Sequence, residues 1–140
     1  MTVETSAGFL GRQPRGDLRL WARAVIDAGA DLVVGHGPHV LRGIEFYRGK
    51  AVVYSLGNFL TYRGFNLEGP LGITGLFTVE LAGDGAFQAG VLHSLIQRPR
   101  QGPAADPARA AHRLVNRLSQ EDFGSGAARI LEDGTILPPR

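Results

Sequence analysis

The sequence contains no cysteine in its 140 residues. This absence excludes disulfide bonds, thiolate metal sites and a cysteine nucleophile, and it leaves the redox compartment open. A metal site in this chain would depend on histidine, carboxylate and amide side chains instead.

A large excess of charge of one sign is also lacking. The 15 lysines and arginines are nearly balanced by 13 aspartates and glutamates, which gives a formal net charge of +2. The arginines are scattered along the chain, and the nearest approach to a cluster is Arg98 with Arg100. This pattern does not indicate a nucleic-acid interface, so we expect no nucleic-acid partner.

Long apolar runs are missing as well. No window approaches the roughly 20 apolar residues of a membrane span, and the opening stretch "MTVETSAGFLGRQPRG" has no apolar run of signal-peptide length. If Met1 is the natural start, the chain carries no export signal of its own. What the sequence does have is 44% hydrophobic residues, enough for a core, and 20 glycines with 8 prolines, which favour many turns over a helical bundle.

The first regular segment predicted after an irregular stretch, residues 1–15, is a helix followed by a strand. Asp17 is the expected N-cap of a helix that runs to about Ala28, with apolar residues at helical spacing on one face. The run Leu32–Val34 then predicts a strand buried on both faces, which ends at Gly35. Helix, tight turn and buried strand form half of an α/β unit, and ligands gather beyond the carboxyl ends of strands in such sheets.

Two β-hairpins and a second helix are predicted after this unit. β-prone residues at 44–47 and 51–55 flank the turn 48–50, and those at 73–81 and 86–97 flank the turn 83–85. A proline-rich connector, residues 98–105, leads to Asp106 and Pro107, which are typical of a helix N-cap and first turn. The helix is expected to end near Ser119, and a short strand over 128–131 follows it.

The segment "GHGPH" contains two of the four histidines, His36 and His39. Pro38 disfavours a helix across the pair, while Gly35 and Gly37 allow backbone conformations that are barred to other residues. The two imidazoles therefore lie on a kinked loop beyond a strand, where they are candidate ligands for a divalent metal. A structural role for both is the alternative, and His93 and His112 are interpreted as packing or surface residues.

Two histidines do not complete a catalytic metal site, which needs about three protein ligands, or a bridging carboxylate if it holds two ions. Asp31 lies at the far end of the strand. Glu45 is expected in a salt bridge, because Arg42 and Arg48 are close in sequence. Asn58 follows a strand and a glycine and is a candidate for the same site, with a left-handed turn residue as the alternative interpretation.

Three segments resemble a known family. "DAGADLVVGHGPHV", "IEFYRGKAVVYSLGNFL" and "LSQEDFG" resemble the CapA/PgsA family of bacterial capsule and poly-γ-glutamate synthesis proteins, which is similar to calcineurin-like metallophosphoesterases. The resemblance extends over residues 16–136 and leaves a tail at 137–140. It implies an α/β fold of an α+β, sandwich-like kind: the C-terminal portion of a four-layer metallophosphoesterase-like domain, with one helix–strand unit, two β-hairpins and a C-terminal helix.

The resemblance also implies roles for the histidine loop. His36 and His39 would be metal ligands, one to each of two ions of Mn, Zn or Fe, and Gly35, Gly37, Pro38 and Asn58 would support the site. The chemistry implied is phosphoester hydrolysis. The family's earlier motifs, which include its aspartate ligands, are absent from this sequence, so we expect only half of a site and no hydrolysis by this chain alone.

Three functions follow as hypotheses. The first is a C-terminal part of a metal-dependent phosphoesterase-type protein in capsule or poly-γ-glutamate synthesis. The second is a non-catalytic component of a polymer synthesis or export complex, and the third is a small β-rich binding module with structural histidines. The strand at 31–35 is expected at a sheet edge, so a chain that carries the N-terminal half of the fold is an expected partner. By resemblance, membrane proteins of polymer synthesis are further partners, and the location is membrane-associated or extracellular in the cell envelope.

Overall fold

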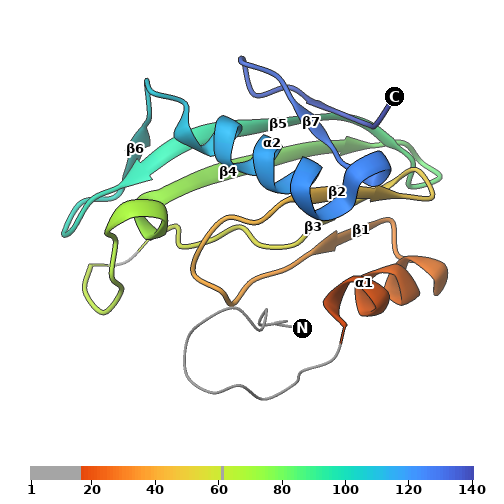
Figure 1. Ribbon diagram of the computed structural model, residues 1–140, viewed down its shortest axis with the longest axis horizontal. Helices are drawn as coiled ribbons and strands as arrows, with labels where there is room; N and C mark the ends of the chain where they lie inside the picture. The colour runs from red at the N-terminus through yellow and green to blue at the C-terminus, as the bar shows by residue number, and fades with distance from the viewer. Residues whose placement is uncertain (1–16, 61) are drawn as a thin grey trace.

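The computed structural model describes residues 17–60 and 62–140 of the chain (Figure 1). The predicted irregular segment 1–15 lies outside the described residues. The described part is a mixed α/β structure of the α+β type, in which two α-helices accompany three small sheets. It contains the predicted helix–strand unit, both hairpins and the second long helix. Neither helix in the described ranges has the length and apolarity that crossing a membrane would need.

Helix α1, Leu18–Asp27, is the predicted N-terminal helix. The Asp17 carboxylate accepts hydrogen bonds from the backbone N–H groups of Arg19 and Leu20, which confirms Asp17 as the N-cap. The helix buries Ala22 and Ile26 against the first sheet. This packing fixes the direction in which the chain enters that sheet.

The first sheet has the strand order β1-β3-β2. Strand β1, Leu32–Val34, pairs in parallel with β3, Lys50–Val53, and β3 forms the predicted hairpin with β2, Ile44–Tyr47. β1 is therefore an edge strand in the described structure, as predicted. Burial on both faces was wrong for Val34, which is 38% exposed, because no strand of the described residues lies beyond β1 and none of them covers that end of it.

The second sheet is antiparallel, with the order β4-β5-β6. The long strands β4, Ile73–Leu81, and β5, Phe87–Gln97, form the second predicted hairpin. A short 3₁₀ helix, Gly69–Gly72, precedes β4. Strand β6, Pro103–Ala105, lies within the segment that was expected to be only a connector.

Helix α2, Ala110–Phe123, begins later than predicted. Asp106 was expected as its N-cap, but the N-cap is Arg109, whose backbone is left-handed with φ of 53°. The Asp106 carboxylate accepts from the backbone N–H groups of Ala108 and Ala110 and from the Ser94 hydroxyl of β5. The prediction failed because this carboxylate closes a turn against β5 before the helix starts.

The C-terminal segment adds a second short 3₁₀ helix, Gly124–Gly126, and a two-stranded sheet of β7, Arg129–Ile130, and β8, Ile136–Leu137. His112 on α2 links this segment to β5: its Nε2 lies 2.6 Å from the Leu92 carbonyl oxygen and its Nδ1 lies 3.1 Å from that of Glu132. These contacts support the interpretation of His112 as a packing residue.

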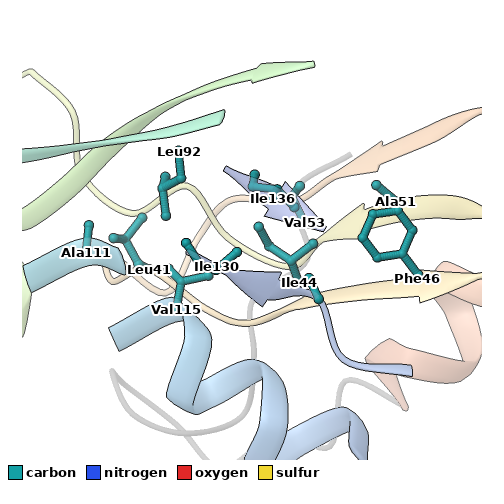
Figure 2. Close-up of a cluster of buried hydrophobic side chains, with 11 residues drawn as sticks. Leu41, Ile44, Phe46, Ala51, Val53, Leu92, Ala111, Val115, Ile130 and Ile136 are labelled. Carbon is teal, nitrogen blue, oxygen red and sulfur yellow. The ribbon is translucent and has the colours of Figure 1, made fainter. Parts of the chain in front are cut away.

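The main core joins these elements, with side chains from the first hairpin, β5, α2 and the β7–β8 sheet (Figure 2). Its buried residues are Leu41, Ile44, Phe46, Ala51, Val53, Leu92, Ala111, Val115, Ala128, Ile130 and Ile136. Burial of apolar side chains on this scale stabilises the fold by roughly 1.5–3 kcal/mol per large residue. The packed core holds the ends of β1 and β3 in place, and the loops that carry the candidate site residues begin at those ends.

Candidate functional site

The histidine loop follows β1 and lies next to the segment that follows β3. Because β1 and β3 are parallel, their carboxyl ends meet at the same edge of the sheet. The Gly35 N–H donates to the Val53 carbonyl oxygen over 2.7 Å, and a bridge between Leu41 and Leu56 joins the two segments further on. Residues 35–41 and 54–60 are thereby held together.

The glycines of the loop have different roles. Gly35 is buried, and a Cβ there would collide with the Tyr54 carbonyl oxygen, so glycine allows the close approach of two backbones. Its φ is not in the left-handed region, so the prediction that Gly35 provides an unusual backbone conformation is wrong. Gly37 does have such a conformation, with φ of 126°. Pro38 follows it in a bend.

His39 is exposed and has a left-handed backbone with φ of 61°, a conformation that few residues other than glycine adopt. Its Nδ1 lies 2.8 Å from the side-chain Oδ1 of Asn58. An amide oxygen only accepts hydrogen bonds, so Nδ1 of the imidazole donates and Nε2 of the neutral ring keeps its lone pair. The geometry leaves Nε2 as the nitrogen that can bind a metal ion.

Asn58 is 4% exposed and is itself held from two sides. Its Nδ2 donates to the Leu71 carbonyl oxygen over 3.3 Å, and its backbone carbonyl accepts from the Thr74 hydroxyl. The alternative of a left-handed turn residue is wrong, because that conformation belongs to Gly57, with φ of 66°, and not to Asn58. The amide is fixed in the orientation that presents Oδ1 to His39.

His36 lies exposed on the same loop. Within residues 17–60 and 62–140, no three histidine, aspartate or glutamate side chains come close enough together to hold a metal ion. Asp31 lies at the other end of β1, where its carboxylate contacts Lys50 Nζ at 2.8 Å. The donor set at the histidine loop is therefore two imidazoles and a supporting amide.

Glu45 forms the predicted salt bridge, but not with the predicted partners. Its Oε1 lies 2.8 Å from Arg19 Nη2 and 2.5 Å from Arg23 Nη2, both on α1, and its Oε2 accepts from the Tyr54 hydroxyl over 2.7 Å. Arg48 instead pairs with Asp27 at 3.0 Å. Strand β2 turns the Glu45 side chain towards α1, so the partners come from a helix 22 residues or more away in sequence.

The Glu45 side chain is fully buried, and its surroundings determine its charge. Burial by itself would raise the pKa of the carboxyl, but hydrogen bonds from Arg23, Tyr54 and Arg19 outweigh burial and hold the pKa below its ordinary value. Burial and the Glu45 carboxylate together raise the pKa of the Tyr54 hydroxyl. Glu45 is therefore ionised in the folded chain, and its ion pairs with Arg19 and Arg23 attach α1 to the hairpin.

An aromatic contact at the histidine loop was missed from the sequence. The Phe65 ring lies 4.7 Å from the His39 ring, centroid to centroid, with an interplanar angle of 63°. The only sequence signal was the apolar content of the segment after Asn58, which includes Phe59, Leu60 and Tyr62, all exposed. Spacing alone gave no reason to place Phe65 beside His39.

Comparison with known proteins shows a family to which the segment that contains these residues is similar. Residues 10–63 match the family model described as bacterial capsule synthesis protein PGA_cap. This part of the chain is similar to that family. The match includes His36, His39 and Asn58, and it confirms the family to which the sequence was similar.

Individual proteins also match part of the chain. Identity is 54% over 52 residues with the PGA biosynthesis protein CapA of Bacillus subtilis, and 50% over 44 residues with the capsule biosynthesis protein CapA of Bacillus anthracis. It is 68% over 52 residues with an uncharacterised Sinorhizobium fredii protein. These alignments cover 37%, 31% and 37% of this chain but only 14%, 11% and 11% of the relatives.

Proposed function

We propose that this chain is part of a CapA-like protein of capsule or poly-γ-glutamate synthesis and that it contributes His36 and His39 to a divalent-metal site. The observation that carries the proposal is the hydrogen bond between His39 Nδ1 and Asn58 Oδ1. Histidine ligands of metals commonly donate their second ring nitrogen to an oxygen acceptor, which fixes the tautomer and the ring orientation. The family of residues 10–63 and the names of its relatives supply the biological setting.

The residues present fit part of a metal site. His39 Nε2 and the exposed His36 imidazole suit Mn, Zn or Fe, but a site for two ions also needs a carboxylate to bridge them. The carboxylates of Asp31 and Glu45 are bound to Lys50 and to the α1 arginines. The further ligands would come from another segment of the protein, and this chain alone would not hydrolyse a substrate.

The exposed edge of β1 suits such a segment. Among residues 17–60 and 62–140, Leu32–Val34 pair with β3 on one side only, so a further strand that pairs with the other side would end or begin next to the histidine loop. We propose that a chain segment with the N-terminal half of the fold pairs there and completes the site. A metal ion held by the complete site would supply Lewis-acid catalysis for phosphoester hydrolysis, while His36 and His39 would hold and orient it.

A cell-envelope setting is part of the same proposal. Capsule and polymer synthesis, which the family and its relatives name, suggest a membrane-associated or extracellular protein with membrane proteins of polymer synthesis as partners. A non-catalytic component of a polymer synthesis or export complex is the second candidate. It is favoured by the lack of a third clustered ligand in the described ranges.

Metal affinity tests the proposal directly. We expect calorimetry and elemental analysis of the purified chain to show at most one weakly bound divalent ion, which the His36→Ala/His39→Ala double variant loses. His93→Ala is the matched control, because His93 is exposed on β5. If wild type and double variant bind the same amount of metal, or neither binds any, the proposed metal role is wrong. Two tightly bound ions would contradict the half-site and call for a phosphoesterase assay.

A further inference from the structure

The orientation of the His39 ring decides where its free nitrogen points. The side chain is exposed, and the hydrogen bond to Asn58 fixes one ring atom, Nδ1. A ring held at one atom can still swing about that contact, and such motion would move Nε2 away from a fixed ligand position. A second contact on a different side of the ring is needed to stop it.

Phe65 provides this second contact. The two rings are 4.7 Å apart between centroids and inclined at 63°, which is a T-shaped arrangement. Aromatic rings prefer such edge-to-face contacts over direct stacking, because the positive edge of one ring meets the negative face of the other. His39 is therefore held by a hydrogen bond at Nδ1 and by an aromatic ring from a segment 26 residues further along the chain.

The exposure of Phe65 calls for an explanation of its own. Phe59, Leu60, Tyr62 and Phe65 lie within seven residues, and all four are exposed, Phe65 by 45%. A ring so accessible to water contributes little to a core. Gly64, with φ of 105°, forms the bend immediately before Phe65, so the backbone shape that places this ring beside His39 depends on a residue without a side chain.

We propose that Phe65 is a positioning residue for His39 and that it keeps the imidazole in the orientation in which Nε2 can bind the metal. The inference rests on the proposed function and adds a specific residue to it. Asn58 sets which nitrogen is free, and Phe65 sets where that nitrogen points. Phe65 thereby acts as a side wall of the site rather than as part of the core.

The test separates ring orientation from metal binding. NMR on the metal-free chain reports the ring-proton shifts and the mobility of His39, and calorimetry with Zn²⁺ alone reports affinity. In Phe65→Leu we expect the His39 ring signals to move and the ring to become more mobile, and Zn²⁺ affinity to fall about three- to tenfold, the range that the loss of one aromatic pair implies. Phe65→Tyr keeps the ring and should restore both readouts.

Phe59→Leu is the matched control, since Phe59 is 43% exposed and lies in the same segment. It should leave the His39 signals and the Zn²⁺ affinity close to wild type. Unchanged His39 signals in Phe65→Leu, or equal effects of Phe65→Leu and Phe59→Leu, would overturn the positioning role. His39 signals that move in Phe65→Leu while wild type binds no Zn²⁺ would instead overturn the proposed function.

Discussion

Two polar centres lie near the first sheet, and they differ in how completely their polar atoms are used. At Glu45, Oε1 accepts from Arg19 and Arg23, and Oε2 accepts from the Tyr54 hydroxyl. At His39, Nδ1 contacts Asn58, while Nε2 remains available to a ligand. Both oxygens of the buried Glu45 carboxylate have hydrogen-bond partners, whereas the exposed His39 imidazole uses one of its two nitrogens.

The backbone shows the same difference. Glu45 lies in a regular strand, paired with Val52 across the hairpin, where its side chain joins helix to sheet. His39 lies in a left-handed conformation that costs a non-glycine residue free energy. Strained backbone is found at ligand sites but also elsewhere, since Arg48, Arg100 and Arg109 have left-handed backbones too. What distinguishes His39 is the combination of this backbone with a hydrogen bond that uses one ring nitrogen and leaves the lone pair of the other available. The comparison therefore assigns Glu45 to stability and supports the proposal that His39 binds a ligand.

The largest expected effect is at Glu45. In Glu45→Ala the two arginines and the buried Tyr54 hydroxyl lose their common acceptor, and we expect unfolding to require about 2–4 kcal/mol less free energy. The Asp31→Asn variant is the control, because it removes an exposed carboxylate paired with Lys50 and should cost about 0–1 kcal/mol. Urea denaturation measures both. Equal losses in the two variants would contradict a stabilising role specific to the Glu45 centre.

A smaller effect is expected at the His39 centre, where the quantity to measure is metal affinity. Asn58→Leu removes the acceptor for His39 Nδ1, and we expect Zn²⁺ affinity to fall by about 10- to 100-fold, as for other groups that orient a ligand. Asn58→Asp keeps an oxygen acceptor and should retain more of the affinity. Calorimetry on folded samples measures it. If Asp and Leu reduce affinity equally, the contribution of Asn58 is packing rather than orientation of His39.

The elements that were predicted correctly from the sequence are those determined by residues close together in the chain. The Asp17 cap, the helix ending before Gly29 and both hairpin turns depend on neighbouring residues. The proximity of His39 to Asn58 was also within reach, because each follows a strand and parallel strands end at the same edge. Local signals and one rule of sheet topology were sufficient for that part of the site.

The features that were mispredicted or missed depend on tertiary contacts. Asp106 has the sequence of an N-cap, but its carboxylate also bonds to Ser94 on β5 and closes a turn before the helix. The arginines on Glu45 come from α1, whereas the arginines close in sequence were expected. Phe65 reaches His39 across 26 residues. No spacing along the chain encodes these contacts, which arise only when the elements pack together.

The smallest expected effect concerns the stability of the fold at acidic pH, to which the Glu45 centre contributes. Because the pKa of the Glu45 carboxyl is held below its ordinary value of 4.5 in the folded chain, the unfolded chain binds this proton more readily. The ionised carboxylate therefore stabilises the fold above that ordinary pKa, and the stabilisation is lost as the pH falls through the lower pKa of the folded state. Wild type should lose unfolding free energy more steeply than Glu45→Gln over this acidic range.

The comparison with Glu45→Gln isolates this carboxyl from the others. Asp106 also has a lowered pKa: burial would raise it, but the backbone N–H groups of Ala110 and Ala108 lower it further. Asp133 has a lowered pKa because it accepts from Thr135. Both groups are present in wild type and variant, so their contributions cancel in the difference between the two curves of unfolding free energy against pH. Parallel curves would show that the charge on Glu45 adds nothing to the free energy of unfolding. The assignment of the Glu45 centre to stability, in contrast to the His39 centre, would then be wrong.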